Sequence, residues 1–473
     1  MELKQEFVEK ALDKALSLGA LFAVVRFHVN KYELITVDSG FLRQYSYTIA
    51  KGMGIEVYTS SGRGYAYTSD LSWESINKTI ERSISIARAV SSKKLEVAFG
   101  EAAKKISFNT SVKKDPLSID PHEKIELLMD LNKLSLSHVG ITSSITNMGI
   151  EVDHRLIASS DGGLAESNIV GVGIAHMAVG KVGLLSERVY DSESFIGGYE
   201  YIEERDWESF VNELSKLAIE ASKAKTPSPG AYSAVLDNEL VGLFIHEAFG
   251  HASEGDLVRS GSSILSGRLG EKVGSEQVTI VDEGLVDGGY PVPFDDECTP
   301  KKKTIVVENG VLKKYLTSRI VATFLNNELT GNARAMNFTY DPIVRQTNFY
   351  IEPGDFSLEE LFEDVDYGIY LRGRGAMGGQ VDPSIGTFTF HVGPSYILRR
   401  GEVGELVRGV IVSGNILDVL NNVDAVAKDL KIRTSVFGGC GKENQLVRVG
   451  DGGPHVRVRK IIVGGELESA RVS

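Results

Sequence analysis

The segment "KAKTPSPGAY", residues 223–232, limits the possible folds of this chain more than any other segment. Pro227, Pro229 and Gly230 stand close together in it, and such a combination interrupts both a helix and a central strand. A chain of 473 residues is long enough for two or more domains, each with its own core. We therefore predict a linker near residues 225–231, an N-terminal domain at 1–225 and a C-terminal domain at 231–473.

The N-terminal domain is predicted to mix helices and strands. Its apolar residues alternate between helical spacing and short β-rich runs that end in Gly, Ser or Asn. This pattern favours antiparallel sheets with flanking helices. The predicted helices cover residues 1–20, 72–90, 121–136 and 206–225, and the strand-like runs include 21–29, 41–50 and 141–160.

The C-terminal domain is predicted to be mostly β, as a sandwich or a barrel-like structure. Asn309-Gly310 stands between two strand-like runs, which is the strongest short signal for a β-hairpin. Two segments interrupt the β pattern and are predicted as helices, one beginning after Asp237 and the other at residues 415–430. The whole chain is therefore assigned to the α+β class, with one helix of the second domain carrying a candidate metal site.

Composition narrows the function and the location. The net charge is −13, which argues against nucleic acid and anionic membranes as main partners. Two cysteines in so long a chain do not form a disulfide framework. The start of the chain lacks the basic and apolar regions of a signal peptide, and no apolar run is long enough to span a bilayer. The predicted location is the cytoplasm.

The candidate metal site is "HEAFGH", in which His246 and His251 are five residues apart and Glu247 follows the first histidine. Chance alone would give roughly 0.02 matches to this pattern in a chain with this many histidines and acidic residues. Asp237 is a plausible N-cap for the helix that carries it. We predict that the two histidines bind a metal ion.

The spacing of the histidines raises a geometric difficulty. On a regular α-helix, residues i and i+5 point about 140° apart, so they cannot share one ion. Either the helix ends at Gly250 or a π-type bulge there aligns the two rings. Gly242 and Gly250 lie one turn on either side of His246, and we expect them to face a cleft and leave room for metal and substrate. Close packing against a neighbouring strand is the alternative.

Two histidines leave zinc short of a third protein ligand. Cys440 stands among Gly438, Gly439 and Gly441, where the backbone can turn sharply and carry a thiolate to an ion, although a buried thiol is the usual fate of a single cysteine. Cys298 has acidic neighbours that disfavour a thiolate, so it is the weaker candidate.

Three further motifs bear on the function. Residues 373–378, "GRGAMG", fit a dinucleotide-binding pattern, but a strand and not a helix is expected to follow them, so that function is rejected. The acidic run at 295–297 is interpreted as a solvated turn in preference to a second carboxylate cluster. Glu254 and Asp256 are close enough to His251 in sequence to orient its ring.

The chain resembles the TldD/PmbA family, whose members are described as candidate modulators of DNA gyrase, and within it the TldD-type zinc metallopeptidases. The resemblance rests on "HEAFGHASEGD", "FDDECTP", "MGGQVDPSIGTFTF", "GGCGKENQ" and "VRVRKIIVGG", and it covers essentially the whole second half. It implies that His246, His251 and Cys440 bind one Zn²⁺ per chain and that Glu247 is the catalytic base. Cys298 stands where the family more often has glycine.

The leading hypothesis is a zinc-dependent peptidase that cleaves unfolded or small peptides, with Glu247 accepting a proton from the attacking water. The alternatives are a zinc hydrolase of a non-peptide amide and a non-catalytic regulatory partner subunit with a structural metal. The family resemblance implies a heterodimer with a related PmbA-type subunit, or a homodimer when that partner is absent. Neither nucleic acid nor a membrane is expected as a partner.

Overall fold

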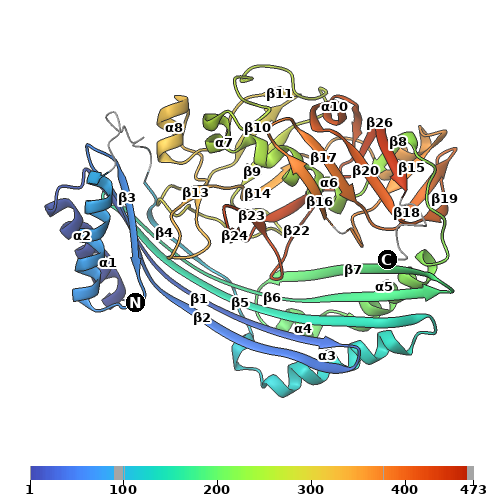
Figure 1. Ribbon diagram of the computed structural model, residues 1–473, viewed down its shortest axis with the longest axis horizontal. Helices are drawn as coiled ribbons and strands as arrows, with labels where there is room; N and C mark the ends of the chain where they lie inside the picture. The colour runs from blue at the N-terminus through green and yellow to red at the C-terminus, as the bar shows by residue number, and fades with distance from the viewer. Residues whose placement is uncertain (1, 90–99, 101, 377, 466–473) are drawn as a thin grey trace.

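The computed structural model of the protein describes residues 2–89, 100, 102–376 and 378–465 (Figure 1). Its first half is built on one sheet of long strands, in the order β3-β2-β1-β5-β6-β4, with β7 also paired to β6. β1 and β2 are antiparallel and meet at Ser39-Gly40, where both residues have positive φ as a tight hairpin turn requires. The strands are β1 (Phe22–Asp38), β2 (Phe41–Tyr58), β3 (Arg63–Thr68), β4 (Lys104–Asn109), β5 (Ile141–Ser159), β6 (Gly163–Val182) and β7 (Leu185–Ile196).

Helices cover one face of this sheet in two groups (Figure 1). The first pair packs the isoleucines of one helical stripe, Ile76, Ile80 and Ile84, against the end of the sheet that holds Val25 and Ile55. The second group packs against the other end through a separate apolar cluster. The helices are α1 (Glu2–Ser17), α2 (Trp73–Ala89), η1 (Pro116–Ser118), α3 (Pro121–Ser137), α4 (Glu200–Glu204) and α5 (Trp207–Ala221).

The second half contains two large sheets. One has six strands in the order β11-β10-β9-β14-β25-β22, and the other has nine, in the order β16-β17-β20-β26-β8-β15-β18-β19 with β21 paired to β26. Asn309 and Gly310 form the predicted hairpin turn, because both have positive φ and connect β10 to β11. The first sheet and the two small hairpins contain β9 (Ile280–Glu283), β10 (Thr304–Glu308), β11 (Val311–Leu312), β12 (Ala333–Arg334), β13 (Ile343–Val344), β14 (Asn348–Ile351), β22 (Lys431–Thr434), β23 (Cys440–Lys442), β24 (Gln445–Val447) and β25 (Gly450–Gly453).

The core of the second half draws its side chains from both large sheets and from the helix that carries the histidine motif. β8 ends at Leu236, directly before that helix, and β15 lies parallel to β8. The nine-stranded sheet contains β8 (Gly230–Leu236), β15 (Tyr367–Leu371), β16 (Gly378–Asp382), β17 (Thr387–His391), β18 (Ser395–Arg399), β19 (Glu402–Val407), β20 (Val410–Asn415), β21 (Val423–Val426) and β26 (Val456–Gly465).

The helices of the second half are short: α6 (Asn238–Phe244), η2 (Ile245–Gly250), η3 (His251–Ser253), α7 (Gly255–Ser260), α8 (Arg319–Leu325), α9 (Leu358–Glu363) and α10 (Ile416–Asn421). The helix predicted over 415–430 is wrong beyond Asn421, because the next residues form β21 and pair with β26. The paired residues of β26 are 30–35 positions away in sequence, so tertiary contact overrides the local apolar spacing.

The α+β class is confirmed, as are a first half with flanking helices and a mostly β second half. The domain division near residues 225–231 stays a prediction. Within the described residues, no helix is both long and apolar enough to cross a bilayer.

Candidate metal centre

The histidine motif lies on a helix that changes its winding. Asp237 caps α6, since its carboxylate accepts a hydrogen bond from the Leu240 amide. From Ile245 to Gly250 the chain winds as a π-helix, in which the His251 amide donates to the His246 carbonyl, five residues back. The two imidazole rings lie with their centroids 5.4 Å apart and their planes perpendicular. A π-type bulge, one of the two predicted geometries, is therefore what brings residues i and i+5 together.

Cys440 completes a group of three donors. It begins β23, and its Sγ lies 3.3 Å from Nε2 of His251. One donor atom each from His246, His251 and Cys440 lies within 4.8 Å of the others, and all three residues are buried. Because zinc binds nitrogen and sulfur at about 2.0–2.3 Å, the donor atoms that share one ion must lie within a few ångströms of one another, as these three atoms do. Nδ1 of His246 is buried and has no hydrogen-bond partner in the described part of the chain, so this imidazole has capacity left for a ligand. The three residues fit a metal ion.

The charges at this centre favour a thiolate. Burial alone would raise the pKa of the Cys440 thiol, but His246 and His251 lower it to about 5. Burial alone would lower the pKa of His246, but the neighbouring Cys440 raises it to about 9. Without a metal ion, the centre is thus a thiolate next to protonated imidazole. A divalent cation would replace these protons and bind the same three atoms.

Glu247 is next to this group without being part of it. Its Oε2 lies 3.9 Å from Nε2 of His251, and its side chain is about one-third exposed, whereas the three donors are buried. A carboxylate beside the donors and open to solvent is placed to accept a proton from water that enters the centre.

Glu254 contacts the His251 ring at Nδ1, while Nε2 of the same ring lies near Cys440. Its Oε2 lies 3.1 Å from Nδ1 of His251, and Lys442 Nζ donates to the same oxygen at 2.9 Å. Burial would raise the pKa of Glu254, but His251 and Lys442 lower it to about 2, so the carboxylate stays charged. The predicted contact between Glu254 and the His251 ring is therefore present. Asp256 instead accepts from Lys442, at 2.7 and 2.8 Å.

Three residues that support the centre were missed in the sequence. Lys442 ties the β23 strand to the segment after His251 through Glu254 and Asp256. The Arg345 guanidinium donates to the carbonyl of Cys440, and Gln346 Nε2 donates to the His246 carbonyl at 3.1 Å. A signal existed only for Lys442, which follows Cys440 by two residues and therefore shares its face of a strand.

The expectation that Gly242 and Gly250 face a cleft is wrong. A Cβ atom on Gly242 would lie 2.3 Å from the Gly452 amide nitrogen, and one on Gly250 would lie 2.0 Å from Oε1 of Gln346. Both glycines are therefore needed for close packing of the helix against β25 and the segment before β14, which was the alternative interpretation.

Cys298 lies away from the metal centre, in an apolar cluster between the two halves of the chain. Burial is the main cause that raises the pKa of its thiol, to about 12, so it is a poor ligand, as predicted. Its φ is +60°, a left-handed conformation that glycine adopts at lower steric cost than cysteine.

The solvated turn predicted at 295–297 is also wrong. Asp295, Asp296 and Glu297 are each at most 4% exposed. Asp296 pairs with Arg155, and Asp295 accepts from backbone amides, including that of Thr299. These partners compensate the burial of the carboxylates, and the distant one, Arg155, could not be read from local sequence. For residues 373–378, β16 follows and not a helix, which agrees with the rejection of a dinucleotide site.

Family models match the chain in three parts. They are described as PmbA/TldA metallopeptidase domain 1, at residues 23–87, the central domain, at 114–222, and the C-terminal domain, at 229–465. The chain belongs to the TldD/PmbA metallopeptidase family.

Relatives within this family match over nearly their full length. A metalloprotease of Methanothermobacter thermautotrophicus is 36% identical over 446 residues, which cover 94% of this chain and 95% of the relative. A zinc metalloprotease TldD homolog of Saccharolobus solfataricus is 30% identical over 467 residues, covering 96% of this chain and 99% of the relative.

Two solved TldD/PmbA structures share the fold at lower sequence identity. A candidate modulator of DNA gyrase from Thermotoga maritima has a TM-score of 0.80 at 22% identity, and covers 97% of this chain and 100% of its own. TldE from Thermococcus kodakarensis has a TM-score of 0.76 at 18% identity, with the same coverage.

Proposed function

We propose that this protein is a zinc-dependent peptidase that cleaves unfolded or small peptides and binds one zinc ion per chain. The observation that carries the proposal is the buried group of His246, His251 and Cys440 with the partly exposed Glu247 beside it. A relative is named a zinc metalloprotease, which supports the choice of metal and reaction.

In this proposal each residue has a separate task. His246, His251 and Cys440 would hold the zinc ion, which when bound polarises a carbonyl group and makes water more acidic. Glu247 accepts the proton of the attacking water and returns it to the leaving amine. Glu254 keeps the His251 ring in place, and Lys442 keeps Glu254 charged and joined to the strand of Cys440. Because a thiolate reduces the effective charge of the ion, the reaction should depend strongly on Glu247.

Two alternatives predict different results. A hydrolase of a non-peptide amide would use the same residues and fail only on peptides. A regulatory subunit with a structural metal would have no need for a partly exposed carboxylate beside the metal ligands. The position of Glu247 favours an enzyme over a structural site.

We also propose that the protein works as a dimer, with a related PmbA-type subunit or with itself. The support is that a solved structure of the same fold is a TldE protein. Enclosure of the centre by a second subunit would restrict it to extended chains.

Replacement of Glu247 by glutamine tests the peptidase proposal. The Glu247→Gln variant should keep about one zinc ion per chain, because no metal ligand changes, and its cleavage of a peptide library should fall by at least about 100-fold, the size of a general-base contribution. Zinc is measured by elemental analysis and cleavage by mass spectrometry.

Glu276→Gln is the matched control, since that carboxylate is exposed and distant from the motif in sequence. It should leave zinc content and cleavage unchanged. Undiminished cleavage by the Glu247 variant would remove its assigned role, and absence of cleavage by the native protein loaded with zinc would refute the peptidase proposal.

A further inference from the structure

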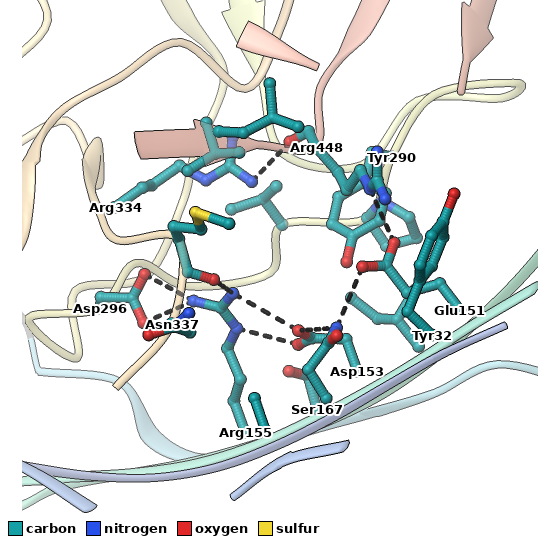
Figure 2. Close-up of a pocket in the computed structure, with 18 of the residues that line it drawn as sticks. Tyr32, Glu151, Asp153, Arg155, Ser167, Tyr290, Asp296, Arg334, Asn337 and Arg448 are labelled. Carbon is teal, nitrogen blue, oxygen red and sulfur yellow. Dashed lines mark hydrogen bonds and ion pairs between the residues drawn. The ribbon is translucent and has the colours of Figure 1, made fainter. Parts of the chain in front are cut away.

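A cavity of about 390 Å³ lies between the long sheet of the first half and the loops of the second half (Figure 2). Its floor is formed by β1, β2, β5 and β6, and its roof by residues near 290–296, 334–337 and 437–448. The volume falls within the roughly 300–1,000 Å³ of small-molecule sites. His246, Glu247, His251 and Cys440 do not line it, so it is separate from the metal centre.

The charges that surround this cavity are paired except for one. Arg155 lies 2.9 Å from Asp153 and 2.8 Å from Asp296, and Arg448 lies 2.8 Å from Glu151. Behind the wall, Arg26 also lies 3.4 Å from Asp296. Each of the three carboxylates that line the cavity thus has at least one arginine within ion-pair distance.

Arg334 differs from these arginines because it forms no ion pair within the described part of the chain. It is 6% exposed, and its guanidinium donates to the backbone carbonyls of Gln346 at 2.7 Å and Arg448 at 2.6 Å. Among the described residues no carboxylate lies within ion-pair distance of it. Burial, together with the charge of Arg155, lowers the pKa of Arg334 to about 10, which is the effect of a buried cation without a matching anion.

We propose that this cavity binds an organic molecule through a single carboxylate group, which Arg334 holds. The two backbone carbonyls fix the guanidinium and use two of its five N–H donors, so three remain for a ligand. A carboxylate matches the planar fork of a guanidinium and supplies the ion-pair partner that Arg334 lacks.

The walls favour an organic acid over an inorganic anion. Ile157, Ile169, Val292 and Phe437 are among the residues that line the cavity, and they give it apolar surface for a carbon chain. A phosphate dianion would bring a second negative charge close to Glu151, Asp153 and Asp296, which are already there. The ligand class is therefore a monocarboxylate with an apolar part.

The position of the cavity connects it to the metal centre. Val447, which lines the cavity, is paired with Cys440 in the β23–β24 hairpin. The Gln346 carbonyl accepts from Arg334, while the Gln346 side chain donates to the His246 carbonyl. A peptidase meets free carboxylates at the C-termini of its substrates and products, so we assign the ligand as the C-terminus of a short peptide. This assignment of the ligand, although not the carboxylate site itself, rests on the proposed function.

The test compares an acid with its amide. Binding of Ala-Ala-Leu, of Ala-Ala-Leu amide and of hexanoate to the full-length, zinc-loaded protein is measured by calorimetry, with the Glu247→Gln variant used to prevent cleavage. The peptide acid should bind at least about tenfold more tightly than its amide, a difference of about 1.4 kcal/mol. Equal affinities of acid and amide would overturn the inference.

Variants locate the site. Arg334→Gln should reduce the affinity for the peptide acid to that of the amide and leave the amide unaffected, whereas Arg268→Gln, a partly exposed arginine paired with Glu271, should change neither. Because Arg334→Gln also loses two backbone contacts, Ala50→Trp serves as a second variant that fills the cavity from β2 and should abolish the difference. A preference for the acid that survives in both variants would overturn the inference.

Hexanoate distinguishes a peptide C-terminus from any other organic monocarboxylate as the source of the bound carboxylate. Weaker binding of hexanoate than of Ala-Ala-Leu supports a peptide C-terminus as the ligand, and equal binding supports the carboxylate site but overturns its assignment to peptides. The proposed function can fail independently of the carboxylate site. If the protein binds the acid more tightly than the amide but cleaves no peptide, the carboxylate site is supported and the peptidase proposal is refuted. If it cleaves peptides but binds acid and amide equally, the peptidase proposal is supported and the carboxylate site is refuted.

Discussion

Cys440 has the chemistry that depends most on its neighbours. A buried thiol is normally neutral, yet two imidazoles beside it lower its pKa to about 5. Cys298 is just as buried, and without such neighbours its pKa rises to about 12. The acidic residues that flank Cys298, together with the resemblance to a known family, were enough to identify Cys440 from the sequence as the better candidate for the third metal ligand. The supporting contacts of Arg345 and Gln346 were not predictable, because their partners are about 100 residues away in the chain.

The protonation of this centre predicts how zinc binding depends on pH. Zinc needs neutral His246 and His251, whose pKa values in the metal-free protein are raised, to about 9 for His246. Cys440, with a pKa of about 5, is already a thiolate at pH 6. Zinc must therefore displace protons from the histidines, and affinity should rise with pH between 6 and 8, by about tenfold or more per unit.

Competition with a coloured chelator, in buffers that do not bind zinc, measures this dependence. Below about pH 5 the thiolate is also protonated, and the dependence should become steeper. An affinity that is constant from pH 6 to 8 would contradict the protonated state described for the histidines.

Among the elements, the π-helical turn from Ile245 to Gly250 determines the site. Its presence was predictable as one of two alternatives, because histidines five residues apart share an ion only if the helix ends or bulges. The reason for the glycines was not predictable. Local sequence shows that a side chain is missing, but only the fold shows whether a ligand or a neighbouring strand occupies the space, and here Gln346 does.

A substitution at Gly250 should therefore affect stability first. Gln346 is fully buried and its amide donates to the His246 carbonyl, so making room for a new methyl group would disturb this contact and the packing around it. Gly250→Ala should therefore destabilise the fold by about 1–3 kcal/mol, as overpacking typically does. Gly441→Ala is the matched control, because its Cβ would meet no atom within 4 Å, and its effect should stay within about 0.5 kcal/mol. Denaturant unfolding of the zinc-loaded proteins measures both. Equal losses in the two variants would contradict this account of Gly250.

At the scale of the whole molecule, one sheet of long strands supports everything else (Figure 1). Its helices cover one face, and its other face carries Arg155 and Tyr32, which reach Asp296 and the Val436 carbonyl of the second half. The class of each half was predictable from apolar periodicity. The contact between the halves was not, since it depends on buried ion pairs between residues more than 100 positions apart, such as Arg155 and Asp296.

The proposed assembly belongs to this scale. We expect light scattering coupled to size-exclusion chromatography to give the mass of a dimer, either for the protein alone or after addition of a related PmbA-type subunit. Cleavage should then be confined to unfolded chains and peptides. A stable monomer that cleaves folded proteins would contradict both parts of the proposal.

X-ray absorption at the zinc edge tests the central claim most directly, because it reports the ligands of the bound ion. The native protein should show about one sulfur at roughly 2.3 Å and two imidazole nitrogens at roughly 2.0–2.1 Å. The Cys440→Ser variant should lose the sulfur contribution, while Cys298→Ser should keep it. A native spectrum without sulfur, or one that Cys440→Ser leaves unchanged, would contradict the assignment of His246, His251 and Cys440 as the zinc ligands.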